Sequence, residues 1–259
     1  KIYSVLEEYF MNLTIMRFIA VTILFFQILI VKAEPLTVGI VSYDPPFVVR
    51  ASTDHYFGFD VEIMTRLCAE MQAQCAFKPM PFNQLFAQLN KGTIDLAIAS
   101  ITITEDRQQK YSFSLPYLVS NARFITNKKN ASLTMNDLNK KTVGVIEGSI
   151  YKEWSNTKLP GVSIKEYPTS EHLIKALNDN EIDAVLMDDY SGDYWLTNSK
   201  NSFTSIGKPF LVGSGYAIMA KSNSPLLIQK VDDALKKITN DEFYISLYRK
   251  YFHTIPTHP

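Results

Sequence analysis

An arginine that follows a strand-like segment is the residue of this sequence best suited to hold an anion. The apolar run after Asp95 predicts a buried strand, and Thr104 is placed to cap a helix that begins with two acidic residues. Arg107 then lies near the carboxyl end of a strand, where open α/β sheets bind ligands. Its two parallel donors, beside the hydroxyls of Ser100 and Thr102, suit a carboxylate. The alternative is a surface arginine paired with an acid of the same turn.

The sequence repeats a short pattern. Segment 37–41 (TVGIV) returns as segment 142–146 (TVGVI), and segment 89–98 returns as segment 177–186. Each copy is predicted to be strand, loop, helix, turn and strand, so the pattern predicts two α/β lobes, which a chain of 259 residues allows. Each match is short enough to arise by chance, but finding both in the same order favours a true repeat.

The loops after the repeated strands carry complementary charges. In the second copy Glu147, Gly148 and Ser149 open a helix through Trp154, and a helix start of this kind can bind an anion. Asp188 ends the second strand, at the place where the first copy leads to its arginine. One lobe thus offers a cation and the other an anion with free amides. The ligand that matches both is an α-amino acid held between the lobes.

The other elements follow from periodicity. Residues 36–41 are typical of a strand, and the two prolines of the following loop, 42–47, cannot continue it. Apolar residues at every fourth position predict a helix over 59–71, and a second apolar stripe predicts one over 82–89. The last stretch, 224–252, is predicted to be helical and to pack back on the first lobe.

The N-terminal residues predict export. A basic residue precedes the apolar run 18–31, and Val31-Lys32-Ala33 matches a cleavage site, so we expect a signal peptide over 1–33 that is cleaved after Ala33. Residues 1–10 precede two candidate start methionines and are expected to be extra sequence. A membrane anchor is the alternative, but the run is short for a span of about 20 residues. No later run is long enough, so the mature protein is predicted to be soluble.

Charge and cysteine content exclude some classes of function. The chain has 26 basic and 26 acidic residues and no basic stripe, which argues against nucleic acid as the partner. Cys68 and Cys75 are an even count in an exported chain and suggest a disulfide, with two buried thiols as the alternative. No cysteine and histidine cluster has the spacing of a metal site, so we expect neither metal nor cofactor.

Taken together, these motifs resemble those of the periplasmic amino-acid-binding proteins of ABC importers (solute-binding protein family 3), in the group that binds lysine/arginine/ornithine, histidine and glutamine. The segments that carry the resemblance are Gly58-Phe59-Asp60-Val61, the two cysteines, Ser100–Thr104 with Arg107-Gln108-Gln109, Val143-Gly144-Val145, Asp188 and Lys250-Tyr251-Phe252.

The resemblance implies a type II periplasmic-binding-protein fold, which is also the binding fold of ligand-gated channels. In that α/β fold two crossover strands join the lobes and the ligand lies in the cleft. It places residues 34–121 and 214–259 in lobe 1 and residues 122–213 in lobe 2.

The resemblance also implies roles for the site residues. It gives the ligand carboxylate to the arginine and to amides of the second lobe, the ammonium to the aspartate, and the side chain to an aromatic residue and the first loop. The residues it predicts to bind ligand are Asp44, Phe82, Ala99, Ser100, Thr102, Arg107, Glu147, Gly148, Ser149, Ile150 and Asp188.

The sequence departs from the basic-amino-acid binders around the ligand side chain. Val41 stands where that group has an acid, Asp44 replaces an aromatic residue, and Ile150 replaces a hydroxyl residue. Either Asp44 or Glu147 restores a negative end for a cationic side chain, or each is a solvated acid at the rim. We expect arginine or another basic amino acid as the ligand, with glutamine or another polar amino acid second.

The function expected from this resemblance is transport rather than catalysis. A monomeric receptor would bind a free amino acid, close by a hinge motion and present it to an inner-membrane ABC permease. The enzyme alternative is a periplasmic cyclohexadienyl or arogenate dehydratase of the same fold, with Glu147 as its general acid. A receptor ectodomain is a third possibility, but it would need a membrane segment after the domain, and the sequence ends at Pro259.

Overall fold

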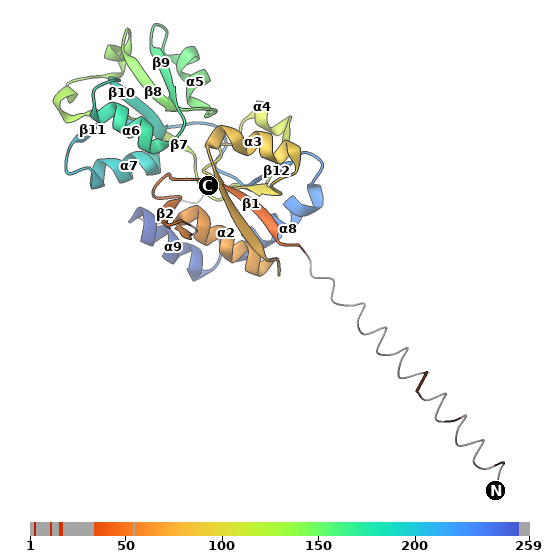
Figure 1. Cartoon of the computed structure of the whole chain (residues 1–259). Coiled ribbons are helices and arrows are strands. Elements are labelled where there is room, and N and C mark those ends of the chain that lie inside the picture. The colour runs from red at the N-terminus through yellow and green to blue at the C-terminus, as the bar shows by residue number, and fades with distance from the viewer. Residues whose placement is uncertain (1–2, 4–10, 12–15, 18–33, 54, 254–259) are drawn as a thin grey trace. The chain divides into compact units, whose positions relative to one another are not determined.

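The computed structural model of the chain describes residues 3, 11, 16–17, 34–53 and 55–253 (Figure 1). The predicted cleavage site after Ala33 and nearly all of the predicted signal peptide lie outside these residues. Within the described part of the chain, no helix is both long and apolar enough to span a membrane.

The first sheet has five strands in the order β4-β1-β5-β12-β6. The central pairs β1–β4 and β1–β5 are parallel, whereas β12 runs antiparallel to β5 and β6. The prediction of a strand over 36–41 is confirmed. The strands are β1 (Leu36–Val41), β4 (Cys75–Met80), β5 (Leu96–Ala97), β6 (Tyr111–Phe113) and β12 (Met219–Lys221).

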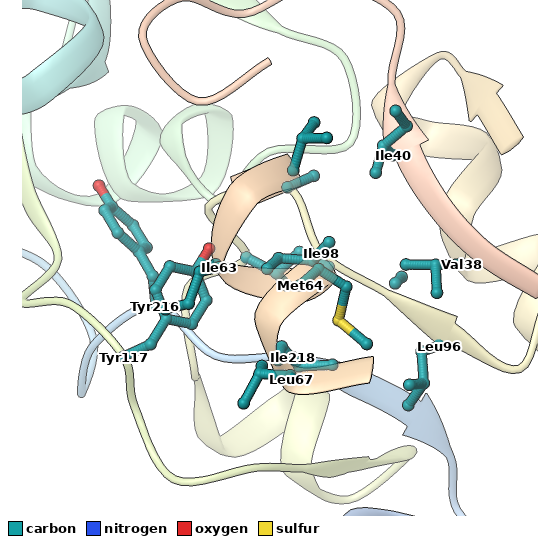
Figure 2. Close-up of a cluster of buried hydrophobic side chains, with 14 of the residues drawn as sticks. Val38, Ile40, Ile63, Met64, Leu67, Leu96, Ile98, Tyr117, Tyr216 and Ile218 are labelled. Carbon is teal, nitrogen blue, oxygen red and sulfur yellow. The ribbon is translucent and has the colours of Figure 1, made fainter. Parts of the chain in front are cut away.

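Helices and a small hairpin cover this sheet and form the first lobe. α2 packs against both α8 and α9, so the prediction that the C-terminal helices return to the first lobe is confirmed. Figure 2 shows the shared core, in which side chains of β1 and β5 meet those of α2 and two tyrosines. These elements are β2 (Val49–Ser52), β3 (His55–Phe57), α2 (Phe59–Glu70), α3 (Phe82–Lys91), α4 (Glu105–Gln108), α8 (Pro225–Ile238) and α9 (Glu242–Phe252).

The second sheet forms the second lobe, with strand order β11-β7-β10-β8-β9. Its members are β7 (Asn121–Asn127), β8 (Thr142–Ile146), β9 (Ser163–Tyr167), β10 (Ala184–Asp188) and β11 (Phe203–Leu211). The accompanying helices are η1 (Lys128–Asn130), η2 (Met135–Leu138), α5 (Tyr151–Lys158), α6 (Ser170–Asn178) and α7 (Asp189–Asn198). In Figure 1 these elements gather around one sheet and α2, α3, α8 and α9 around the other.

The repeat in the sequence is a repeat in structure. β1 pairs with β5 through Val38↔Leu96, and β8 pairs with β10 through Val143↔Ala184, which are equivalent positions of the two copies. The aspartate before each second strand binds the first strand in the same way. Asp95 accepts from the Thr37 amide at 2.8 Å, and Asp183 accepts from the Thr142 amide at 2.9 Å. Both copies therefore use one local design, which is the repeat that the sequence predicted.

The chain passes between the two sheets twice, and the two passages are hydrogen-bonded to each other. The Val212 amide donates to the Ser120 carbonyl at 2.9 Å, and the Tyr216 amide donates to the Leu118 carbonyl at 2.8 Å. These paired segments are the crossover strands that the resemblance implied. Away from them, Cys68 and Cys75 form a disulfide between the end of α2 and the start of β4, so the alternative of two free thiols is wrong.

Candidate ligand-binding site

A pocket opens between the two lobes at the carboxyl ends of their strands. Eight of the predicted ligand-binding residues line it: Asp44, Phe82, Ser100, Thr102, Arg107, Ser149, Ile150 and Asp188. Most of the remaining wall is apolar or aromatic, from Val41, Tyr43, Met80, Pro81, Ile146, Tyr151, Pro168 and Met187, and the hydroxyl residues Ser42, Thr169 and Ser170 complete it. The lining thus has few charged groups, and their positions decide what the pocket can bind.

Arg107 is held from both lobes. Thr104 caps α4 as predicted, accepting from the Arg107 amide at 3.3 Å, and this places the arginine in the first turn. Its Nη1 donates to the Thr102 carbonyl at 2.9 Å, and its Nη2 donates to the Gly148 carbonyl of the second lobe at 3.1 Å. The side chain is buried, so the alternative of a surface arginine is wrong. Burial lowers its pKa to about 10, which leaves it cationic at neutral pH.

Aromatic rings hold the guanidinium from the side. Its central carbon lies 5.7 Å from the centre of the Phe82 ring and 5.0 Å from that of Phe86. Both phenylalanines come from α3, and a cation over a ring face is attracted to it. Phe82, which was predicted to cover the ligand, therefore also helps to fix the arginine.

The floor of the first half of the pocket is a strained turn over a buried carboxylate. Ser100 has a φ of +44°, in the left-handed region that a residue with a side chain rarely adopts. Its amide donates to Asp60 at 2.9 Å, and the hydroxyl of Tyr117 donates to the same carboxylate at 2.9 Å. Asp60 is fully buried, and burial raises its pKa to about 7. β5 ends at Ala97, before this turn, so the strand is shorter than the apolar run predicted.

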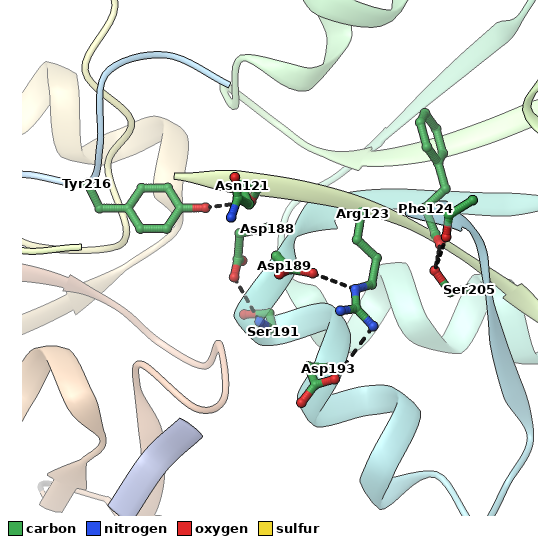
Figure 3. Close-up of polar contacts among 10 residues, drawn as sticks. Asn121, Arg123, Phe124, Asp188, Asp189, Ser191, Asp193, Ser205 and Tyr216 are labelled. Atoms are coloured by element: carbon green, nitrogen blue, oxygen red, sulfur yellow. Dashed lines mark hydrogen bonds and ion pairs between the residues drawn. The ribbon is translucent and has the colours of Figure 1, made fainter. Parts of the chain in front are cut away.

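Asp188 lies at the equivalent edge of the second lobe. It caps α7, because its Oδ1 accepts from the Ser191 amide at 2.8 Å (Figure 3). Arg123 on β7 fixes the same helix through Asp189, with 2.5 Å between Nε and Oδ1. Asp188 is 7% exposed, and burial raises its pKa to about 6. A rigid helix start therefore presents a desolvated carboxylate to the pocket.

Asp44 is a second acid of the pocket wall. A tight turn holds its backbone: the Asp44 amide donates to the Val48 carbonyl at 2.8 Å, and the Val48 amide donates back at 2.9 Å. Its Oδ1 accepts from the Ser191 hydroxyl of the second lobe at 3.1 Å. Burial and the charge of Asp188 raise the pKa of Asp44 well above its ordinary value. Glu147, the other acid considered for this role, is exposed and does not line the pocket.

The Gly148 segment brings the lobes close together. Gly148 has a φ of +78°, and a Cβ at this position would lie 3.0 Å from the Cα of Asn83 in α3. The predicted helix through Trp154 is present, but it begins at Tyr151, with Ile150 rather than Ser149 at its N-cap. The amides of this segment were expected to be free, and for Ser149 this is wrong, since its amide donates to the Ile146 carbonyl at 3.1 Å. Gly148 and Ala99, which were also predicted to bind ligand, are not among the residues that line the pocket.

Comparison with known proteins identifies the family of the chain that forms this pocket. Residues 36–254 match the family model described as bacterial extracellular solute-binding proteins, family 3. The chain belongs to this family. The match covers both lobes and both crossover segments, so the family 3 fold accounts for the whole described structure from β1 to α9.

Individual relatives of this family 3 protein bind amino acids. The arginine-binding periplasmic protein of Mannheimia haemolytica is 30% identical over 233 residues, which cover 89% of this chain and 96% of that protein. The L-cystine-binding protein TcyJ of Escherichia coli K12 is 29% identical and covers 84% of this chain and 82% of its own length. An arginine transport-system periplasmic binding protein from Legionella pneumophila has a TM-score of 0.81 at 32% identity, covering 84% and 99% of the two chains.

The family 3 pocket includes residues that sequence reasoning missed. Tyr43, Tyr151 and Ser170 all line it, and the Ser170 hydroxyl donates to the Tyr43 carbonyl of the other lobe at 2.8 Å. One feature of the sequence could have predicted that this segment reaches the pocket. Thr169 is a cap residue at the start of α6, directly after a strand of the second sheet, and this edge of the sheet is where ligands bind.

Proposed function

We propose that this family 3 protein is the substrate-binding component of an amino-acid ABC importer, with a cationic L-amino acid such as arginine as its ligand. The observation that carries the proposal is the charge of the pocket lining, which has two aspartates, Asp44 and Asp188, and one arginine, Arg107. A neutral zwitterion compensates one carboxylate and the arginine. One buried carboxylate is then left over, and a buried charge is costly unless it is paired. A second cationic group on the ligand supplies that pair.

The expected roles of the residues follow their positions. Arg107 would hold the ligand carboxylate in the first lobe, because it lines the pocket and each terminal nitrogen carries a second N–H beside the one that it donates to Thr102 or Gly148. Asp188 would accept from the α-ammonium in the second lobe. Asp44 supplies the surplus charge, and the apolar and aromatic wall would cover the methylene groups of a long side chain. The names of the arginine-binding relatives support this ligand class.

Two other ligand classes compete with this one. A neutral polar amino acid such as glutamine fits the zwitterion site alone. L-cystine is the ligand in the name of a relative at similar identity, and it is also neutral overall. Glutamine has no second cationic group. L-cystine has a second ammonium group, but it also brings a second carboxylate, for which the described pocket lining has no further cation, and we therefore place both second.

The proposed activity is binding and release without covalent chemistry. Glu147, the general acid that the dehydratase alternative required, is exposed and lies outside the pocket lining, so nothing in the geometry favours that enzyme. We infer that residues 34–121 with 214–259 and residues 122–213 move as two lobes about the paired crossover segments. Export to the periplasm with cleavage after Ala33, a monomeric state and an inner-membrane permease as partner complete the proposal.

A panel of amino acids tests the proposed ligand. Thermal unfolding of the purified mature protein is followed with each of the twenty amino acids and with L-cystine. A ligand that binds the folded state raises the midpoint, and it does so more the further its concentration exceeds its dissociation constant. We expect arginine, lysine or both to give the largest shift, and calorimetry to give a one-to-one complex. If glutamine or cystine raises the midpoint and the basic amino acids do not, the assignment to a cationic ligand is wrong.

A further inference from the structure

Ser191 contacts both acids of the pocket at once. Its amide donates to Asp188 at 2.8 Å, and its hydroxyl donates to Asp44 at 3.1 Å. Ser191 and Asp188 belong to the second lobe, at the start of α7 (Figure 3), whereas Asp44 belongs to the first-lobe loop after β1. The serine is fully buried. One residue therefore fixes a pair of carboxylates whose members come from different lobes.

The lobes can meet in this way only when the two carboxylates approach each other. Like charges repel, and the repulsion grows as the surroundings lose water. Within the described pocket lining Arg107 is the sole cation, and it is engaged elsewhere, with the Thr102 and Gly148 carbonyls. Closing the cleft around a neutral ligand therefore leaves the pair with one positive charge at most, the ligand ammonium. The second carboxylate must then stay unpaired or take up a proton, in line with the raised pKa of Asp44.

We infer that Ser191 is a positioning residue that holds Asp44 and Asp188 as one carboxylate pair across the cleft, so that closure is favourable only around a ligand that carries a net positive charge. The inference deepens the proposed function and rests on it. Ligand choice is then decided when the cleft closes, since the surplus negative charge opposes joining the lobes until a ligand cation compensates it.

The hydroxyl of Ser191 can be removed alone. Ser191→Ala deletes the bond to Asp44 but keeps the backbone amide that Asp188 accepts from. The matched control is Ser155→Ala in α5, because Ser155 is also fully buried and its hydroxyl has no hydrogen-bond partner among the described residues. Affinities for L-arginine and L-glutamine are measured by calorimetry for both variants and for the unchanged protein. We expect S191A to bind arginine about tenfold more weakly, with a smaller change for glutamine, because a charged acceptor loses its donor.

Asp44→Asn tests the pair without depending on the identity of the ligand. The substitution removes the repulsion while keeping an acceptor for Ser191. We expect D44N to have a smaller radius of gyration than the unchanged protein in X-ray scattering without added amino acid, and to lose its preference for arginine over glutamine.

These measurements separate failure of the inference from failure of the proposed function. If S191A behaves like S155A, or if D44N scatters like the unchanged protein, the carboxylate pair does not control closure. If the unchanged protein binds no basic amino acid, the proposed ligand class is wrong, yet scattering by D44N still decides whether the pair holds the lobes apart.

Discussion

Each lobe brings an equivalent pair of strands to the cleft, β1 and β5 in the first lobe and β8 and β10 in the second, but the chain leaves the second strand of each pair differently. In the first lobe β5 stops after two residues, and the chain continues through the strained Ser100 to α4. In the second lobe β10 runs for five residues and leads directly into α7, with Asp188 as the cap. The first arrangement leaves room for a long arginine that reaches back over the strand end, whereas the second leaves a short carboxylate fixed at a helix start.

The difference teaches how a duplicated design acquires opposite charges. Each charged group is oriented by the backbone of its own lobe, since Arg107 donates to the Thr102 carbonyl and Asp188 accepts from the Ser191 amide. We call the part of the pocket around Arg107 the first half-site and the part around Asp188 and Ser191 the second half-site. Each half-site also contacts the other lobe, the first from Arg107 to the Gly148 carbonyl and the second from Ser191 to Asp44. The half-sites are therefore each complete in their own lobe and coupled across the cleft.

Removing the cation should abolish the first half-site. We expect Arg107→Ala to weaken amino-acid binding by about 1,000-fold, because a desolvated carboxylate of the ligand would lose its charged partner. Calorimetry measures the loss, and circular dichroism checks that the variant is folded. Arg107→Lys is the matched control: it keeps the charge but not the fork of donors, so binding should recover only in part. Unchanged affinity in R107A would remove this arginine from the site.

Replacing the Asp188 carboxylate by an amide should weaken ligand binding at the second half-site without destabilising the fold. Asparagine caps helices as well as aspartate does, so Asp188→Asn should keep the free energy of unfolding nearly unchanged while lowering affinity about 100-fold. Asp188→Ala should in addition lose about 1 kcal/mol of stability with the cap. Chemical denaturation and calorimetry measure the two effects separately. Equal affinity in D188N and the unchanged protein would show that the ammonium is bound elsewhere.

The close approach of the lobes at Gly148 can be obstructed by one methyl group. In Gly148→Ala the Cβ would lie 3.0 Å from the Cα of Asn83, and the left-handed φ adds strain. We expect about tenfold weaker binding, because the Gly148 carbonyl would move away from Arg107. The control is Gly92→Ala, which has a similar φ of +71° but no atom within 4 Å of the added Cβ. G92A should lose about 1 kcal/mol of stability with unchanged affinity, and equal affinities in both variants would contradict the role of this contact.

How much of this site the sequence could predict depends on the distance along the chain between interacting groups. The strand pairs, the cap at Thr104 and the position of Asp188 follow from local patterns, and all were predicted. The turn at Ser100 was not, because the carboxylate that accepts from its amide belongs to Asp60, 40 residues earlier in the chain. The contact between Ser191 and Asp44 spans 147 residues and joins a hydroxyl to a loop acid. No periodicity records such a pair, since only the meeting of the lobes creates it.

The smallest expected effect is a pH dependence of stability, which comes from buried acids in both lobes. Asp60 in the first lobe has its pKa raised to about 7 and Asp188 in the second to about 6, while both titrate near 3.8 when unfolded. Between pH 4 and pH 7 the folded state therefore holds more protons than the unfolded state, so these groups lower the stability as the pH rises. We expect the unfolding midpoint without ligand to be higher at pH 5 than at pH 7.5.

The variant Asp60→Asn assigns this pH dependence to one lobe. Asparagine keeps an acceptor for the Ser100 amide but cannot ionise, so the difference in midpoint between pH 5 and pH 7.5 should shrink.

The affinity for a cationic amino acid should change with pH in the opposite sense. Binding favours the ionised forms of Asp44 and Asp188, so affinity should rise by roughly threefold from pH 5.5 to pH 7.5 in both proteins. An unchanged midpoint difference in D60N would place the titrating group at the pair of Asp44 and Asp188, where Asp44→Asn or Asp188→Asn would remove it instead.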